Sequence, residues 1–286
     1  MDPLLVLFGF GVGILVGTTG MGGGSLMTPL LILLFGIKPV VAVGTDLAYA
    51  AITKTAGGLL HLRRGTVDTR LAWWLAAGSC PGAIVGVIML DRLGIKDALV
   101  PMIASALLLT GALVMLRALV LDGAGERETI DLQSRHKAFA VALGASVGFV
   151  LGVTSAGSGT LIAIGLVLAF RLSPRRVVGT DVFHAAVLLW TAAIAHLFSG
   201  NVDLTLAGTI LLGSLPGVWL GTHLATRLPE RGLRPALGIV LLTSGLTLLG
   251  KAGVNVPVAV IVAVPFLLAG ASVAVLRVPG PARAET

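Results

Sequence analysis

The sequence is poor in cysteine, in aromatic residues and in charge. It has one cysteine, Cys80, with 5% aromatic and 12% charged residues. A single cysteine excludes a disulfide within the chain and a metal site built from several thiolates. No aromatic or basic tract is present that would bind bases and phosphates, which excludes nucleic acid as a partner despite a net charge of +7. No Walker sequence occurs, which argues against an ATP-driven pump, and no cofactor or metal is predicted.

Hydrophobic residues dominate instead, at 56% of the chain with a mean hydropathy of +1.02. Apolar stretches follow one another with short breaks, which predicts an all-α integral membrane protein rather than a membrane barrel. Membrane lipid is then a partner, and the basic loop residues face anionic headgroups. The expected segments are residues 4–20, 24–37, 40–60, 71–90, 98–121, 138–154, 157–172, 176–198, 204–224, 233–250 and 254–276.

Lys and Arg are distributed unevenly between the loops. Fifteen of the 20 lie in the C-terminal tail and in alternate loops, around residues 63–70, 117–137, 171–176 and 227–234. The positive-inside rule places these loops in the cytoplasm. We therefore expect a multi-pass protein of the plasma (inner) membrane, with its N-terminus outside and its C-terminus in the cytoplasm.

The chain also repeats itself at an offset of 135 residues. Residues 17–93 align with residues 152–228 without a gap, and 29 of these 77 positions are identical. Charged loops of one copy match uncharged loops of the other, so that the copies have opposite orientations, as in an inverted-topology repeat of five segments. The expected parts are a first inverted repeat at 1–121, a cytoplasmic linker at 122–137, a second inverted repeat at 138–253, and an additional C-terminal helix and tail at 254–286.

Two short gaps rich in glycine and hydroxyl residues occupy equivalent places in the copies. Neither gap, at residues 18–25 and 153–160, carries a charge. We interpret each as the break in a re-entrant or broken helix pair near the midplane, where protein or a polar cavity must satisfy the irregular backbone. The alternative is two full spans joined by a tight surface turn.

A helix that begins at such a break directs free N–H groups and its positive dipole end at one spot, which suits a small anion. The alternative role of these small residues is close helix packing. The residues expected to bind the anion here are Thr19, Gly22, Gly23, Gly24, Ser25, Thr154, Ser158, Gly159 and Thr160.

A Gly-Thr-Asp sequence recurs in the third segment of each copy, at residues 44–46 and 179–181. An ionisable residue within a span costs about 2.5 to 3.5 kcal/mol, so both aspartates are functional candidates. A structural cap at a helix start is the alternative. Two further substrate-binding hydroxyls are expected beside them, at Thr45 and Thr180.

Lys54 lies near the centre of the third segment, where the second copy has Leu189. A lone ammonium at that place needs a counter-ion, which is either Asp46 or Asp181 across the bundle, or a transported anion. We expect Lys54 to supply the positive charge of the anion site.

Histidine and proline provide the other candidates. A histidine can carry a coupling proton, although histidines at loop junctions are often simple interfacial residues. Proline removes a helix hydrogen bond, so Pro81 and Pro216 are expected to act as hinges, although rigid proteins also contain kinked helices. The residues expected to have a coupling or structural role are Asp46, Asp181, His184, His61 and His196.

Taken together, these elements resemble the TauE/SafE family of sulfite exporters. The resemblance rests on residues 17–25 with Pro29, on Gly44-Thr45-Asp46, on Gly65-Thr66-Val67-Asp68 and on Gly78-x-x-Pro81-Gly82, with the same pattern between Gly152 and Gly221. It implies a permease without ATP hydrolysis for small sulfur-containing anions such as sulfite, sulfoacetate and related organosulfonates. The second copy departs from the glycine run at Ser155, Ala156 and Ser158, so its tip is expected to offer hydroxyls.

The predicted function is secondary transport of a small sulfur-containing anion, such as sulfite or an organosulfonate, by alternating access, and not enzyme catalysis. Two other interpretations stay open. One is an anion channel of the same fold. The other is an intramembrane serine hydrolase with Ser158 as nucleophile and His184 or His196 as base, although no buried carboxylate is placed to orient that base. The sequence is compatible with a homodimer.

Overall fold

In the computed structural model, helices account for most of the residues that the structure describes, which are 3–19, 24–92, 94, 98–120, 132–225 and 230–277, without some side chains at helix ends. The helices are α1 (Pro3–Thr19), α2 (Gly24–Leu34), α3 (Pro39–Arg63), α4 (Thr69–Arg92), α5 (Leu99–Val120), α6 (Ser134–Thr154), α7 (Ser158–Leu168), α8 (Pro174–Phe198), α9 (Leu204–Ala225), α10 (Glu230–Lys251) and α11 (Val258–Arg277).

Each apolar segment expected from the sequence coincides with one of these helices, which confirms an all-α fold. Five helices are long and apolar enough to cross a membrane, namely α4, α5, α6, α8 and α9. The bounds differ from the expected ones by up to four residues. Helix α7 ends at Leu168 and α11 begins at Val258, and α6 begins at Ser134, within the last four residues of the expected linker. The polar residues at its start extend the helix beyond its apolar part, and residues 121–131 lie outside the described residues.

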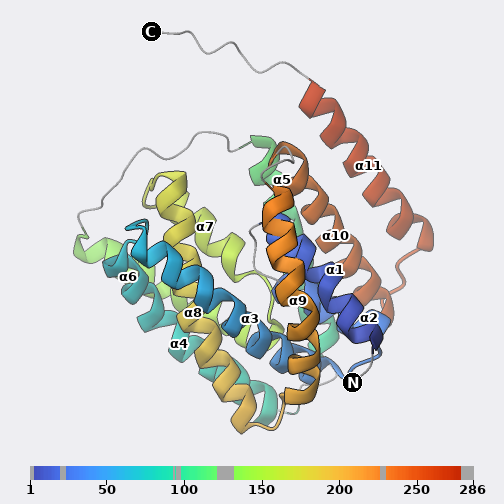
Figure 1. The fold of residues 1–286 in the computed structure, drawn as a ribbon, viewed down its shortest axis with the longest axis horizontal. Coiled ribbons are helices and arrows are strands. Elements are labelled where there is room, and N and C mark those ends of the chain that lie inside the picture. Colours follow the sequence, from blue (N-terminus) through green and yellow to red (C-terminus); the bar gives the residue numbers. More distant parts are fainter. Residues whose placement is uncertain are drawn as a thin grey trace.

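Helix packing joins the N-terminal half, α1–α5, to the C-terminal half, α6–α10. Helix α1 packs along α9, α6 along α4, α3 along α8, and α5 along α10. The two short helices are each inserted beside a long one, α2 against α3 and α7 against α8. Helix α11 packs on α10 at the outer side of the bundle (Figure 1).

Two seams, α1 with α9 and α6 with α4, are lined with glycine every fourth residue. At each of these positions an added Cβ would lie closer than 3.0 Å to a backbone oxygen of the facing helix. Glycine therefore allows the two backbones to touch, as is common between helices in membranes. The glycines are Gly9, Gly13 and Gly17 on α1, Gly213, Gly217 and Gly221 on α9, Gly144, Gly148 and Gly152 on α6, and Gly78, Gly82 and Gly86 on α4.

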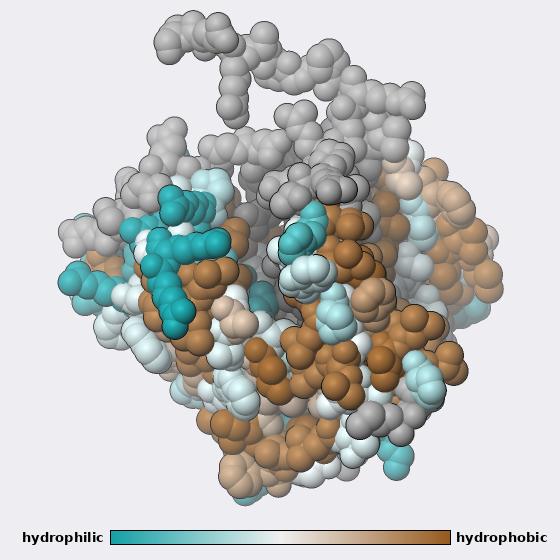
Figure 2. Space-filling view, in the orientation of Figure 1, coloured by the Kyte–Doolittle hydropathy of each residue, from teal (hydrophilic) through white to brown (hydrophobic). Residues whose placement is uncertain are grey.

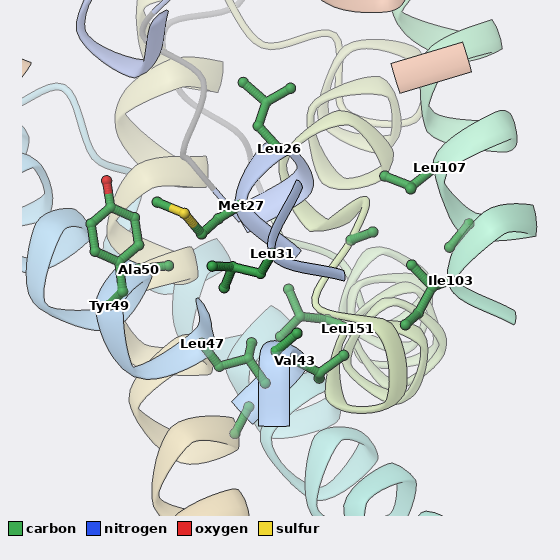
Figure 3. Close-up of a cluster of buried hydrophobic side chains, with 14 of the residues drawn as sticks. Leu26, Met27, Leu31, Val43, Leu47, Tyr49, Ala50, Ile103, Leu107 and Leu151 are labelled. Atoms are coloured by element: carbon green, nitrogen blue, oxygen red, sulfur yellow. The ribbon is translucent and has the colours of Figure 1, made fainter. Parts of the chain in front are cut away.

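The surface and the interior of the bundle are both largely apolar. Figure 2 shows hydrophobic side chains over much of the visible face and hydrophilic ones gathered mainly at the upper left. Inside, Met27 and Leu31 of α2 pack against Val43 and Leu47 of α3, and Leu151 of α6 joins the same cluster (Figure 3). This cluster holds α2 between α3 and the end of α6.

Helices α2 and α7 have only 11 residues each. At a rise of about 1.5 Å per residue, each is about 16 Å long. The hydrocarbon core of a bilayer is about 30 Å thick. Neither helix is therefore long enough to span the membrane by itself.

Candidate functional site

The first Gly-Thr-Asp element contacts the loop between α8 and α9. Gly44 lies against the backbone carbonyl of Asn201, where a Cβ would not fit. The hydroxyl of Thr45 accepts a hydrogen bond from the backbone N–H of Asp203 at 3.0 Å. The carboxylate of Asp203 in turn accepts the backbone N–H of Leu206 at 2.9 Å and so caps the start of α9.

The second element makes the reciprocal contacts with the loop between α3 and α4. Gly179 lies against the backbone of Thr66, and Thr180 accepts the backbone N–H of Asp68 at 2.9 Å. Asp68 caps α4 through Leu71, as Asp203 caps α9. Each half thus holds a loop of the other half. The hydroxyls of Thr45 and Thr180, expected to bind substrate, already accept these backbone bonds.

Asp46 lies deeper, among α2, α3 and the segment between α6 and α7, and its side chain is 0% exposed. Its Oδ2 accepts three hydrogen bonds: from the backbone N–H of Thr28 at 3.2 Å, from the Thr28 hydroxyl at 2.6 Å and from the Ser155 hydroxyl at 2.9 Å. Its Oδ1 is buried and has no hydrogen-bond partner among the residues that the structure describes. Asp46 therefore connects α2 to the C-terminal half rather than capping its own helix.

Asp181 occupies the equivalent place in the C-terminal half and is 8% exposed. Its Oδ2 lies 3.3 Å from where a Cβ on Gly159 would be. The carboxyl group is therefore next to the N-terminal turn of α7. Both aspartates thus lie beside the start of a short helix, the place where we expected an anion. A carboxylate at a helix start is itself stabilised by the helix dipole.

The break between α6 and α7 consists of Ser155, Ala156 and Gly157. Ser155 and Gly157 both have positive φ angles, of 59° and 93°. A positive φ is uncommon for serine, and here its hydroxyl is held by Asp46. The hydroxyl of Thr154, expected to bind substrate, donates to the Val150 carbonyl of its own helix at 2.7 Å. Thr160 is half-buried at the start of α7.

Several expected anion-binding groups lie outside the described residues. Gly22 and Gly23 are among them, and so are the side chains of Thr19, Ser25 and Ser158. The backbone of Gly24 and Ser25 forms the start of α2. The direct anion contacts expected at these breaks stay predictions.

Lys54 lies where α3 and α8 cross. Its neighbour Thr55 accepts a hydrogen bond from the indole N–H of Trp190 at 2.9 Å. These two residues are equivalent in the sequence repeat, so Lys54 lies next to a contact between equivalent positions of α3 and α8. Lys54 is half-buried and forms no ion pair with any residue that the structure describes. Asp46 is eight residues away, about 12 Å along the helix.

His184 and Tyr49 occupy equivalent positions and face equivalent serines on opposite halves. The Nε2 atom of His184 lies 2.8 Å from the Ser79 hydroxyl of α4, and its buried Nδ1 has no partner in the described ranges. The Tyr49 hydroxyl faces Ser214 of α9 but makes no hydrogen bond within the described residues. Both side chains are thus buried polar groups at the interface between the halves.

His196 and His61 are equivalent in sequence but differ in their contacts. His196 is buried, donates from Nε2 to the Gly152 carbonyl of α6 at 2.8 Å, and lies 3.5 Å from the side-chain amide of Asn201. That amide also donates to Asp91 at 3.1 Å. His61 is half-buried, and its Nδ1 lies 2.9 Å from the hydroxyl of Thr66 in the next loop.

Pro81 and Pro216 lie inside α4 and α9, which continue through them without a break in the helix. Both are exposed on the outer side. Their expected role as hinges stays a prediction. For the hydrolase interpretation, His184 contacts Ser79 and His196 contacts Gly152, so each candidate base is engaged by a group other than Ser158.

Sequence reasoning missed two of the residues that surround Asp46. The hydroxyl of Thr28 has no counterpart in the second copy, where the equivalent residue is Ala163. Ser155 is visible in the sequence only as a departure from the glycine run. The glycine seams had a readable signal, because their members recur every four residues at the 135-residue offset.

The chain is similar to known membrane transport proteins. The model of the family described as "Sulfite exporter TauE/SafE" matches residues 5–248. The probable membrane transporter protein YjnA of Bacillus subtilis is 38% identical over 256 residues, which cover 87% of this chain and all of that protein. The probable membrane transporter protein YdhB of the same organism is 29% identical over 246 residues, covering 86% of this chain and 99% of YdhB. No solved structure matches the chain. The chain is therefore a membrane protein that belongs to the TauE/SafE sulfite exporter family.

Proposed function

We propose that this protein is a secondary transporter that moves a small sulfur-containing anion, such as sulfite or an organosulfonate, across the plasma membrane by alternating access. Two five-helix halves of inverted topology enclose the anion near the midplane and expose it to one side at a time. The family description and the relatives' names as probable membrane transporters support transport in general. The choice of a sulfur anion rests on the family alone.

The pattern of helix packing supports two related halves. Each helix of α1–α5 corresponds in the repeat to the helix five places later, in α6–α10. Under this correspondence the packed pair α1 and α9 becomes the packed pair α6 and α4, and the pairs α3 with α8 and α5 with α10 correspond to themselves. The reciprocal contacts of Thr45 and Thr180 follow the same correspondence. Such a pattern is expected when a two-fold axis relates the halves, and the short α2 and α7 then have the length of half-spans.

The observation that carries the anion site is Lys54. The residue is half-buried at the crossing of α3 and α8 and forms no ion pair with an acidic residue among those described. A charge within a span needs compensation, and a transported anion provides it. In the proposed site Lys54 supplies the net charge, while the starts of α2 and α7 supply backbone N–H groups. Asp46 and Asp181 lie beside these starts and set their local charge.

The test is anion transport by the purified protein in lipid vesicles. Uptake of sulfite, sulfoacetate, thiosulfate and sulfate is measured at two pH values, with protein-free vesicles as control. The proposal expects saturable uptake of at least one sulfur anion, and faster exchange when the same anion is present on the other side. Uptake that does not saturate and shows no exchange would indicate an anion channel. The absence of uptake for all four anions would contradict the proposal.

A further inference from the structure

The two oxygens of the Asp46 carboxyl group have unequal surroundings. Oδ2 is bonded by three donors, two from Thr28 and one from Ser155. Oδ1 is fully buried, and within the described part of the chain it has no hydrogen-bond partner and the group forms no ion pair. A buried carboxylate without a cation is costly unless it takes up a proton. Because the lone pairs of Oδ2 face donors, Oδ1 is the oxygen on which a proton can reside.

We propose that Asp46 is the site that binds the proton coupled to anion transport, and that releasing this proton tightens the connection between α2 and the break at Ser155. The inference rests on the transport function proposed above. Hydrogen bonds to an ionised acceptor are about twice as strong as bonds between neutral groups. The ionised form of Asp46 therefore holds Thr28 and Ser155 firmly, whereas the protonated form at Oδ1 lets them separate.

The position of Asp46 allows one proton to affect both halves. Thr28 belongs to the short helix α2 of the N-terminal half, and Ser155 ends α6 of the C-terminal half. The break before α2 and the break between α6 and α7 are the parts of the chain that we expect to contact the anion. A change in the bonds at Oδ2 would therefore alter the relative placement of the two proposed anion-binding tips. This provides a direct physical link between protonation and access to the site.

The other titratable groups near Asp46 come from three elements. Tyr49 lies one turn further along α3 and is buried. The Cβ of His196 on α8 lies 3.3 Å from where a Cβ on Gly44 would be, and the backbone of Asp203 bonds to Thr45. The described side chains of α2, and the break at residues 155–157, bring hydroxyl, backbone and apolar groups. None of these groups is a cation bonded to Asp46.

A proton fits this site better than a metal ion. A metal ion needs several oxygen ligands with free lone pairs, whereas the groups around Oδ2 point their hydrogens at it. In the part of the chain that the structure describes, no group of three or more His, Cys, Asp or Glu residues is suitably placed to hold a metal. The single unpartnered oxygen of Asp46 is sufficient for a proton and insufficient for a metal.

The experiment compares gradient-driven uptake with exchange in lipid vesicles that contain a pH indicator. For the wild-type protein we expect protons to move with the anion, and a difference of one pH unit to change anion accumulation by about tenfold per coupled proton. The variant Asp46→Asn keeps the size of the side chain but cannot ionise. It is expected to retain exchange and to lose the response to the pH difference. Asp203→Asn, which can still cap α9, is the matched control and is expected to behave like the wild type.

The outcomes separate this inference from the proposed function. Anion flux without proton movement in the wild type, or a D46N variant that still responds to the pH difference, overturns the coupling role alone. Flux driven by a sodium gradient instead overturns it as well. Absence of any anion flux contradicts the transport function. If D46N does not fold, Asp46→Glu decides: a shifted pH dependence of exchange supports the proposal, and an unchanged one overturns it.

Discussion

The two Gly-Thr-Asp elements have the same role in their first two residues and diverge at the third. Gly44 and Gly179 both admit a loop backbone of the other half, and the threonines after them both accept a backbone N–H from it. At the aspartates the halves differ, since Asp46 is fully buried and bonded to Thr28 and Ser155. The repeated residues build a common scaffold, and the neighbours that differ between copies set the chemistry of each aspartate.

The same division holds elsewhere in the molecule. The glycine seams recur in both halves with the same spacing. By contrast, Lys54 corresponds to Leu189, Tyr49 to His184, and Thr28 to Ala163. Lys54, His184 and the hydroxyl partner of Asp46 on α2 are thus found where the copies depart from each other. A substrate and its coupling ion are not symmetric, so a functional site on a symmetric scaffold requires such departures.

The largest expected effect comes from removing the charge of Lys54, which is present in the first copy of the repeat and not in the second. Lys54→Leu gives both halves a leucine at this position and should weaken anion binding by about 2 to 5 kcal/mol, the range for deleting one partner of a buried charge pair. Binding is measured as ligand-induced thermal stabilisation, and folding by gel filtration. Leu189→Lys in the K54L background tests the comparison further, because partial recovery is expected if the lysine lies near the axis. Unchanged binding by K54L would make this lysine structural.

The two glycine seams between the halves test whether equivalent contacts are packed with equal tightness. Gly13→Ala and Gly148→Ala place a methyl group against a facing backbone, and each should destabilise the protein by up to about 3 kcal/mol through overpacking. Gly11→Ala is the control, because no atom lies within 4 Å of its added Cβ. Thermal unfolding in detergent measures the three variants. A tolerated alanine in one seam only would show that the halves are packed differently.

The reciprocal threonines provide a smaller and more exact comparison. Thr45→Val leaves the N–H of Asp203 without its acceptor, and Thr180→Val does the same to Asp68. Each variant should lose about 1 to 2 kcal/mol of stability, because a backbone donor is left unsatisfied. The two losses should agree closely. Unequal losses in the same unfolding assay would indicate that one loop is held by other contacts.

The histidines should give the smallest effect and the clearest difference between the halves. His196→Ala removes the bond to the Gly152 carbonyl and should cost about 1 kcal/mol. His61→Ala should cost less, because the Thr66 hydroxyl keeps its bond to the backbone carbonyl of residue 61. Equal losses in stability would contradict the asymmetry of their contacts. Normal transport by both variants would argue against a coupling role for either histidine.

The sequence was sufficient to predict the eleven helices, because apolar length and charged loops are local signals that tertiary packing does not override. It was also sufficient to select Asp46 and Asp181 as unusual, since a carboxylate inside an apolar span is costly wherever it points. Helix α6 begins at Ser134, four residues before the expected apolar segment, because polar residues such as Arg135 can prolong a helix outside the hydrocarbon core.

The partners of Asp46 could not be predicted in the same way. Thr28 is 18 residues away and Ser155 is 109 residues away, and nothing in the local sequence of either one indicates such a contact. Two features of the break at Ser155 also depend on tertiary structure. One is the positive φ of this serine, and the other is the Asp46 carboxylate of the other half, which accepts a hydrogen bond from the serine hydroxyl. The glycine seams, however, could have been read from their spacing.

The packing of helices of one half against helices of the other has a consequence for folding. Among the described residues, the glycines of α1 face α9 and those of α4 face α6, so a half made alone would present these glycine-lined surfaces to lipid. The two halves therefore form one interdigitated helix bundle rather than two neighbouring domains. A polypeptide cut between residues 121 and 131 should assemble when both fragments are synthesised together, and neither fragment should persist by itself.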